Sequence, residues 1–195
     1  MIFALAFVVA YLVGAFPTAY VVGRLRNIDI TKEGSGNVGG TNALRVLGIG
    51  PGITVAVTDF LKAIIPTYVA LHVLGLPLWQ ALAVAAAAIV GHNWSVYIGF
   101  KGGKGIACTI GVSAVLFPGV LLASLVIAAF SVVVTRYVSL GSLLLTALMP
   151  IILFYNRHPQ EYIWFAVFLM IFATHRHRSN IERLLNGTER KIGKK

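Results

Sequence analysis

Long apolar runs are the feature of this chain that most constrains its fold. Of its 195 residues, 58% are hydrophobic and 11% are charged, against about 25% charged residues in soluble domains. A membrane-spanning helix needs about 20 mainly apolar residues. We therefore predict an all-α polytopic membrane protein, with residues 1–195 in one integral membrane domain. The runs are Ile2–Gly23, Ile49–Leu74, Leu78–Ile98, Ile106–Val134, Val138–Tyr155 and the shorter Tyr162–Thr174.

The first run is predicted to be a retained transmembrane helix. It is too long for the core of a signal peptide, and no basic region precedes it. The single cysteine, Cys108, rules out an internal disulfide and a cysteine-pair metal site. We interpret Cys108 and His72 as structural, and we predict no metal site and no cofactor.

The Pro118-Gly119 pair interrupts the fourth run and decides the predicted topology. If it is a turn, the chain crosses the membrane seven times, with its N-terminus outside and its C-terminus in the cytoplasm. Fourteen of the sixteen lysines and arginines then lie on the cytoplasmic side, leaving Arg157 outside and Lys62 within the membrane. If the run crosses once, the basic tail moves outside, against the positive-inside bias. The tail charges are Arg176, Arg178, Arg183, Arg190, Lys191, Lys194 and Lys195.

We therefore predict seven transmembrane helices, of which the two formed from Ile106–Val134 are short. The first of the two would span about 18 Å of a hydrocarbon core of about 30 Å. It must lie within a bundle, under thinned lipid, or beside a polar cavity that opens to the cytoplasm. The net charge of +10 then reflects membrane orientation, and we predict no nucleic-acid partner.

The segment Gly34–Arg45, GSGNVGGTNALR, cannot fill an apolar core, because glycines and polar side chains dominate it. Backbone amides, hydroxyls and the fixed charge of Arg45 are groups that hold an anion. The alternative is a flexible connector, since glycine and asparagine are ordinary loop residues. The residues able to form hydrogen bonds are Ser35, Asn37, Thr41 and Asn42.

A second polar segment, Gly99–Gly105, leads into an apolar helix expected to begin near Ile106. Its glycines let backbone amides approach an anion, the helix N-terminus adds positive potential, and Lys104 adds a point charge. The spacing is not that of a Walker phosphate loop. The segment also fits a basic cytoplasmic turn that only sets topology.

The tail that begins at His175 is the third polar segment. His177 and Asn180 stand three residues apart, so on a helix they share a face, where a histidine and an amide could bind a hydroxyl-bearing ligand. Glu182 and Glu189 lie among arginines and are expected to brace the tail by charge pairing. The alternative is a basic segment lying on anionic lipid headgroups.

Asp59 and Lys62 are ionisable residues inside the second apolar run, about one helical turn apart. Charges at that depth are costly and usually face a bundle interior or a cavity. The two residues could form a self-neutralising pair that fixes helix packing, or they could have a direct functional role. His92-Asn93 either supports a site or is interfacial, and Ser142 fits helix packing.

Together, the blocks GSGNVGGTNALR, KGGKGIA and HRSNIERLLNGTE resemble the signature blocks of the bacterial acyl-phosphate:glycerol-3-phosphate acyltransferases, the PlsY family. The resemblance covers the whole length. It implies an enzyme of the bacterial inner membrane, with its site facing the cytoplasm, that transfers a fatty acyl group from acyl phosphate to the 1-hydroxyl of sn-glycerol 3-phosphate. The products would be lysophosphatidic acid and phosphate, the first step of phospholipid synthesis. Membrane lipids are expected partners, and neither coenzyme A nor acyl carrier protein is required.

The resemblance also implies roles for individual residues. Ser35, Arg45, His177 and Asn180 match functional positions, and the second block with Lys104 matches the family's glycerol-phosphate site. We expect catalytic roles for Ser35, Arg45, Lys104 and His177. We expect substrate contacts from Gly34, Gly36, Asn37, Thr41, Asn42, Gly102, Gly103, Gly105, Ser142 and Asn180. We expect structural roles for Glu189, Asp59 and Lys62.

The chain contains no G-x-S-x-G nucleophile elbow, and no histidine is followed four residues later by aspartate. Since acyl phosphate is already activated, we expect direct attack by the glycerol hydroxyl without an acyl-enzyme, catalysed mainly by positioning and charge stabilisation. The base is either His177, whose basicity neighbouring arginines would lower, or the phosphate of the substrate itself.

Two other classes of protein stay open at this point. A transporter of anions or organophosphates would use the basic loops as a gate and would need a second vestibule on the outer side. The predicted outer face, however, has almost no charge beyond Arg157. A lipid-binding scaffold would not need the glycine-rich loops. Formation of lysophosphatidic acid without coenzyme A separates the enzyme from both.

Overall fold

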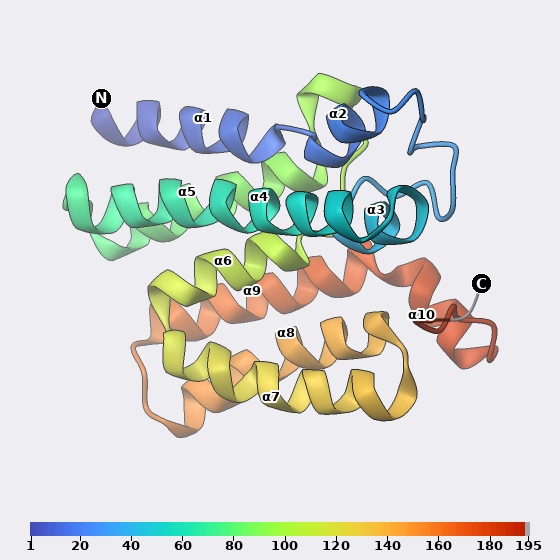
Figure 1. The fold of residues 1–195 in the computed structure, drawn as a ribbon. Coiled ribbons are helices and arrows are strands. Elements are labelled where there is room, and N and C mark those ends of the chain that lie inside the picture. Colours follow the sequence, from blue (N-terminus) through green and yellow to red (C-terminus); the bar gives the residue numbers. More distant parts are fainter. Residues whose placement is uncertain (194–195) are drawn as a thin grey trace. The chain divides into compact units, whose positions relative to one another are not determined.

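The computed structural model describes residues 1–193, which form helices joined by loops (Figure 1). The predicted all-α class is confirmed. The chain divides into two compact units, unit 1 (Met1–Val115) and unit 2 (from Leu116 onward). Lys194 and Lys195, which we counted among the cytoplasmic charges, lie outside the described residues. The helices are α1 Ile2–Ala15, α2 Thr18–Arg24, α3 Gly40–Leu47, α4 Ile49–Tyr68, η1 Val69–Val73, α5 Leu78–Asn93, η2 Val96–Ile98, α6 Ile106–Leu116, α7 Pro118–Thr135, α8 Val138–Tyr155, α9 Gln160–Arg176 and α10 Arg178–Leu185.

Within residues 1–193, five helical segments are long and apolar enough to cross a membrane. The apolar helix α6 is shorter, with 11 residues, and α9 has 17. The number of crossings and their orientation stay predictions. The five segments are Ile2–Arg24, Ile49–Val73, Leu78–Ile98, Pro118–Thr135 and Val138–Tyr155.

A proline divides the first apolar run, which the sequence predicts to be one continuous helix, but the second run stays continuous. α1 ends at Ala15 and α2 begins at Thr18, because Pro17 has no backbone N–H and its ring crowds the preceding turn. In the second run, Pro66 lies inside α4, and the last turn continues as the π-helix η1.

The predicted break at Pro118 is present. α6 ends at Leu116 and α7 begins with Pro118, where the missing N–H would have no helical partner in any case. Our expectation that both helices are short was wrong for α7. It continues without a breaker to Thr135 and has 18 residues, or about 27 Å at the rise of an α-helix.

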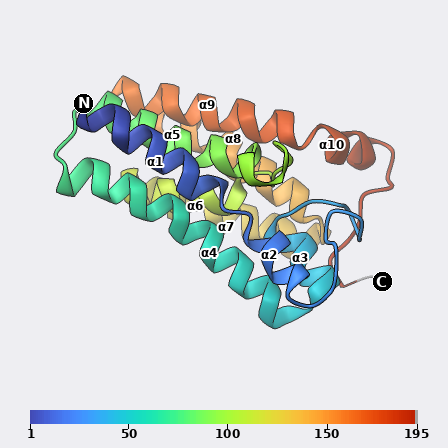
Figure 2. The ribbon, with the colours of Figure 1, turned by 90° about the horizontal axis from the view of Figure 1, so that it is seen from above.

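In unit 1, α1 packs along α5 through small residues (Figures 1 and 2). A Cβ at Gly14 of α1 would overlap the backbone of Ala88, and one at Gly91 of α5 would overlap the backbone of Tyr11. Small residues let helix backbones approach closely where lipid removes the hydrophobic drive for association. This contact holds the end of α5 against the break between α1 and α2, where Ser95 Oγ donates to the Ala15 carbonyl.

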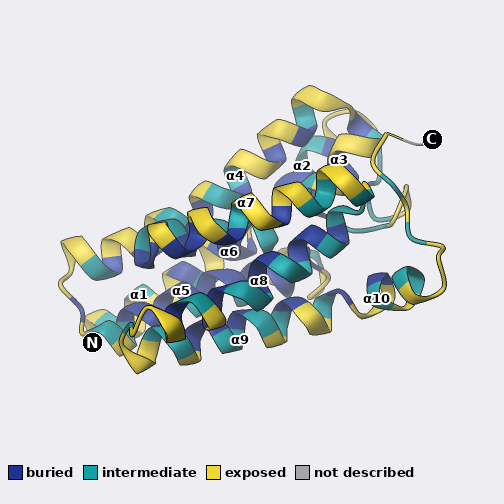
Figure 3. Cartoon of the chain, turned by 90° about the horizontal axis from the view of Figure 1, so that it is seen from below, coloured by how far each residue is buried: buried dark blue, intermediate teal, exposed yellow. Residues whose placement is uncertain are grey.

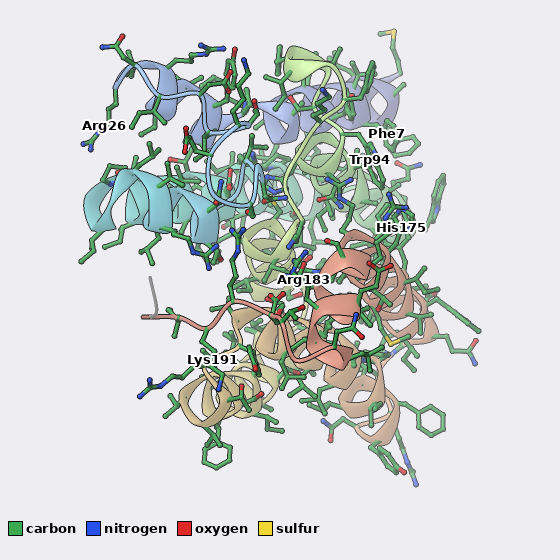
Figure 4. The ribbon with its side chains drawn as sticks, turned by 90° about the vertical axis from the view of Figure 1, so that its right-hand side faces the viewer. Phe7, Arg26, Trp94, His175, Arg183 and Lys191 are labelled. Atoms are coloured by element: carbon green, nitrogen blue, oxygen red, sulfur yellow. The ribbon has the colours of Figure 1, made fainter. Side chains whose placement is uncertain are left out.

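In unit 2, α8 packs against both α7 and α9. Gly141 of α8 lies against Ala128 and Val132 of α7, where a larger residue would not fit. The chain after α10 returns to the α7–α8 connection, where the Ile192 amide donates to the Arg136 carbonyl at 2.9 Å. The ammonium of Lys191, labelled in Figure 4, lies 5.2 Å from the centre of the Tyr137 ring.

The long helices carry apolar side chains on their exposed faces. Figure 3 colours the exposed residues of α4 and α7 yellow. The stripe on α4 repeats every four residues, while the same helix buries Asp59 and Lys62. Apolar groups outside and charges inside reverse the pattern of a soluble helix, and lipid is the solvent that favours this arrangement. The exposed residues are Ile53, Val57, Leu61 and Ile65 on α4, and Leu122, Val126, Phe130 and Val133 on α7.

Candidate active site

The side-chain amide of Asn42 closes the first polar loop in unit 1. Its Oδ1 accepts a hydrogen bond from the Ser35 amide at 2.9 Å, and its Nδ2 donates to the carbonyls of Glu33 at 3.1 Å and Ile30 at 3.4 Å. The residue is 2% exposed. Asn42 therefore shapes the loop from within, and its expected contact with substrate stays a prediction.

Two glycines in this loop adopt conformations that other residues avoid. Gly34 and Gly36 have φ angles of +61° and +69°, in the left-handed region that glycine enters without steric cost. A Cβ at Gly34 would overlap Asn42 Oδ1, and one at Gly36 would lie 2.9 Å from the Thr31 carbonyl oxygen. The glycines thus allow the loop to close tightly on Asn42.

Asp29 ties the start of the loop to α2. Its carboxylate accepts from the Thr31 hydroxyl at 2.6 Å and the Thr31 amide at 3.2 Å, and Arg24 Nη2 lies 3.1 Å away. The hydrogen bond from the Thr31 hydroxyl, and to a lesser extent the Arg24 charge, lower the pKa of Asp29. The loop therefore begins from an ionised carboxylate.

The other predicted site residues of this block, catalytic or substrate-binding, differ from Asn42 in exposure. Ser35, Thr41 and Arg45 are exposed, and Asn37 is half-buried. Arg45 stands in the last turn of α3, which the closed loop precedes. The block thus combines an internally bonded frame with an outward guanidinium, an arrangement that presents fixed positive charge to an anion.

The second polar loop rests on the end of α5. The Gly103 amide donates to the His92 carbonyl at 3.0 Å. A Cβ at Gly102 would overlap the backbone of Asn93, and one at Gly103 would overlap the His92 ring. The chain then enters α6 with Gly102, Gly103 and Gly105 buried and Lys104 half-buried. Backbone amides in the first turn of a helix attract negative charge.

Asp59 and Lys62 form a buried ion pair beneath this loop. Lys62 Nζ lies 2.8 Å from Asp59 Oδ1, and both side chains are almost fully buried. His92 Nδ1 lies 3.6 Å from the same carboxylate oxygen. The Cys108 thiol donates to the Asp59 carbonyl at 3.1 Å. The pair thus joins α4 to α5 and α6 inside unit 1.

Glu189 organises the third block, in unit 2. Its Oε1 accepts from Asn180 Nδ2 at 2.6 Å and from Ser139 Oγ at 2.8 Å, and its Oε2 accepts from Arg183 Nε at 2.8 Å. Arg183 is labelled in Figure 4. We expected Glu182 to brace the tail as well, but it is exposed and forms no salt bridge within residues 1–193, because Glu189 occupies the inward position beside Arg183.

Burial would raise the pKa of Glu189, but hydrogen bonds from Asn180, Arg183 and Ser139 outweigh that effect, and the pKa lies below its ordinary value. The carboxylate is therefore ionised at neutral pH. It holds the ends of α8 and α10 together by charge-assisted hydrogen bonds.

His177 lies at the junction of α9 and α10, not inside one continuous helix as the spacing suggested. The turn is nevertheless kept, since the Asn180 amide donates to the His177 carbonyl at 2.8 Å. His177 Nδ1 lies 2.7 Å from the Ala173 carbonyl oxygen, which can only accept. In the neutral imidazole Nδ1 therefore carries the hydrogen and Nε2 is the acceptor.

Ser142 is buried in α8, and its hydroxyl donates to the Val138 carbonyl at 2.9 Å. Back-bonding of this kind is usual for serine inside helices. A contact between Ser142 and substrate stays a prediction.

The predicted residues fall into two groups. Unit 1 carries Ser35, Arg45 and Lys104 with their glycine loops, and unit 2 carries Ser142, His177, Asn180 and Glu189. No group of three histidine, cysteine, aspartate or glutamate side chains within residues 1–193 is arranged to hold a metal ion.

Sequence reasoning missed the partners that hold these residues. Ser139 reaches Glu189 across 50 positions, and His92 reaches Asp59 from another helix. The one signal within the sequence was the position of a carboxylate deep inside an apolar run, since a buried carboxylate requires partners. Depth identifies the need for partners but not the residues that supply them.

Comparison with known proteins identifies the family. A family model described as glycerol-3-phosphate acyltransferase matches residues 4–187. A glycerol-3-phosphate acyltransferase of Halalkalibacterium halodurans is 47% identical over 195 residues, covering 95% of this chain and 93% of the relative. One from Shouchella clausii is 48% identical over 192 residues, with the same coverage.

The fold matches solved structures equally well. A crystal structure of PlsY (YgiH), an integral membrane glycerol 3-phosphate acyltransferase, in its glycerol 3-phosphate form is 36% identical, with a TM-score of 0.94 over 99% of this chain and 96% of that one. A lysophosphatidic acid form gives a TM-score of 0.92 with the same identity and coverage. The chain therefore belongs to the glycerol-3-phosphate acyltransferase family and is an acyltransferase of the integral membrane class.

Proposed function

We propose that this protein transfers a fatty acyl group from acyl phosphate to the 1-hydroxyl of sn-glycerol 3-phosphate, releasing lysophosphatidic acid and phosphate. The observation that carries the proposal is the likeness to two forms of one acyltransferase, a glycerol 3-phosphate form and a lysophosphatidic acid form. The first names the acceptor of an acylation and the second names its product.

The chemistry of the chain favours acyl phosphate as the donor and direct attack. The glycerol hydroxyl oxygen bonds to the acyl carbonyl carbon, the bond from that carbon to the phosphate oxygen breaks, and phosphate leaves. The only cysteine is buried and donates to a carbonyl, and Ser142 bonds within its own helix. Neither is placed to form an acyl-enzyme. Arg45, Lys104 and the loop amides would hold two phosphorylated substrates against their repulsion.

The proton of the attacking hydroxyl goes either to His177 or to the phosphate of glycerol 3-phosphate. The His177 tautomer leaves Nε2 as the acceptor, which suits a base and equally suits a group that orients the hydroxyl. His177→Ala separates the two. If the substrate phosphate is the base, the KM for glycerol 3-phosphate rises while turnover stays measurable. Complete loss of turnover at saturating glycerol 3-phosphate assigns the base to His177.

Purified protein incubated with palmitoyl phosphate and radiolabelled glycerol 3-phosphate tests the proposed reaction. We expect labelled lysophosphatidic acid without coenzyme A or acyl carrier protein. Arg45→Ala and Lys104→Ala should each lower kcat/KM by roughly 100-fold, as expected for loss of a charged group that stabilises the transition state. Arg157→Ala removes an arginine from the predicted outer face and should leave the rate unchanged. Labelled product only with a thioester donor would refute the proposed donor.

We also propose seven crossings in the bacterial inner membrane, with the N-terminus outside and the three blocks in the cytoplasm. Separate helices on each side of Pro118 support this count, as does the positive-inside bias. With Cys108 replaced by alanine, single cysteines at Leu25, Arg157 and Thr188 can be labelled with a membrane-impermeant maleimide. In right-side-out vesicles only the cysteine at 157 should react. Reaction at Leu25 or Thr188 there would contradict the orientation.

A further inference from the structure

The break between α1 and α2 exposes a backbone carbonyl inside unit 1. Phe16 precedes Pro17, and its carbonyl oxygen accepts a hydrogen bond from Lys62 Nζ at 2.8 Å. A backbone carbonyl within a membrane needs an internal partner, because no water is available. Lys62, only 6% exposed, supplies that partner.

Asp59 neutralises the buried ammonium of Lys62 and is itself contacted by a second helix. Its Oδ1 lies 2.8 Å from Lys62 Nζ and accepts from the Thr18 hydroxyl at 3.4 Å. An isolated charge in this environment would be far more costly than a paired one. Asp59 therefore couples α4 to the start of α2 as well as to Lys62.

His92 continues this contact toward the second polar loop. One edge of its ring, Nδ1, faces Asp59 Oδ1 at 3.6 Å. The other edge faces Gly103, where a Cβ would overlap Nε2 and Cε1. The His92 carbonyl also accepts from the Gly103 amide. Both the ring and the backbone of His92 therefore define where Gly103, the residue before Lys104, can lie.

We propose that His92, held by the Asp59–Lys62 pair, is a positioning residue that sets the loop Lys101–Gly105 and thereby places Lys104 for glycerol 3-phosphate. This inference rests on the proposed function. A pair that served helix packing alone would not require the ring that contacts the loop.

Replacing His92 with glutamine tests the inference in the full-length enzyme, with palmitoyl phosphate as donor. The loop loses the ring that supports Gly103. We expect the KM for glycerol 3-phosphate to rise roughly tenfold, as a small misplacement of a binding group can produce. We expect kcat to change by less than about threefold and the KM for palmitoyl phosphate to stay the same. Thr67→Val, which removes a buried hydroxyl that donates to the Ala63 carbonyl within α4, should change stability but not this KM.

A double-mutant cycle separates positioning from general destabilisation. If His92 acts through Lys104, His92→Gln in a Lys104→Ala background should raise the KM further by less than about twofold, because residues that share one function are not additive. Additive effects, or an unchanged KM in His92→Gln alone, would overturn the inference. A wild-type enzyme that makes lysophosphatidic acid while His92→Gln behaves identically refutes the positioning role but not the proposed function.

Gly103→Ala tests the same contact from the loop side, in case His92→Gln does not fold. The added methyl group has no room beside the His92 ring, so the KM for glycerol 3-phosphate should rise. Adding His92→Ser to Gly103→Ala makes room for the methyl group. The double variant should then have the KM of His92→Ser alone, and a larger KM would contradict the proposed contact.

Discussion

The first and third polar blocks are both closed by one central side chain, but the chemistry of closure differs. In the first loop, Asn42 is a neutral amide that accepts one hydrogen bond and donates two. In the third block, Glu189 is a carboxylate that accepts three. The first loop depends on steric fit, since Gly34 must leave room for Asn42. The third block depends on hydrogen bonds to a charged carboxylate.

This difference predicts different vulnerabilities. A loop held by a neutral amide and left-handed glycines should be sensitive to the size of side chains, and its hydrogen bonds to Asn42 should not titrate. A segment held by a carboxylate should be sensitive to charge and pH and tolerant of small changes in size. Within one enzyme, the first block is therefore organised mainly by steric fit and the third mainly by electrostatic interactions.

Of the changes that test this comparison, Glu189→Ala should have the largest effect on stability and activity. It removes the acceptor of three side chains, one of them charged, and each hydrogen bond to a charged group contributes roughly 1.5–3 kcal/mol. We expect a loss of at least about 3 kcal/mol in stability and a large loss of activity. Thermal unfolding in detergent and the acyltransferase assay measure both effects. Glu182→Ala, on the exposed side of α10, is the matched control, and an equal loss there would contradict the assignment.

Gly34→Ala should cause the next largest loss of stability. The left-handed φ costs an alanine roughly 1–2 kcal/mol, and the methyl group would overlap Asn42 Oδ1. Gly50→Ala supplies a control in the same unit, because nothing lies within 4 Å of its added Cβ, and alanine favours a helix. Thermal unfolding should show a loss for Gly34→Ala alone. Equal behaviour of the two variants would break the steric half of the comparison.

The pH dependence of stability should show the smallest effect. The pKa of Glu189 is lower in the folded than in the unfolded chain, so its contribution is present above the ordinary glutamate pKa of about 4.3 and is lost as pH falls through the folded value. The difference in unfolding temperature between wild type and Glu189→Gln should therefore shrink below about pH 4. The difference for Gly34→Ala should stay constant, and a parallel decline would refute the distinction.

Much of the fold could be predicted because its signals are local. Apolar runs of spanning length identified the helices, and Pro118 identified a break between two of them. Pro17 carried an equally local signal that we did not use, so the break after Ala15 was missed. Dividing Ile106–Val134 at Pro118 also led to the prediction that both resulting helices are short, although the 18 residues of α7 suffice for a crossing.

The sequence was enough to propose residues for the candidate site, but it did not reveal the groups that hold those residues in place. Glycines, Arg45, Lys104 and His177 are chemically recognisable wherever they occur. The acceptor role of His177 Nε2 depends on the Ala173 carbonyl, which only the turn at the end of α9 places beside the ring. A contact between Asn42 and substrate stays a prediction, and only the tertiary structure shows that its side chain also bonds within the loop.

The sequence alone determined that this chain forms apolar helices and that its candidate anion-binding residues lie in three short blocks, because hydropathy and residue chemistry act over a few neighbouring positions. Only the tertiary structure decided which groups hold those blocks. Ser139 meets Glu189, and Asp59 meets both Lys62 and His92. Most of these contacts join separate helices, and a charge or amide buried in an apolar protein takes whichever partner helix packing brings within hydrogen-bonding distance.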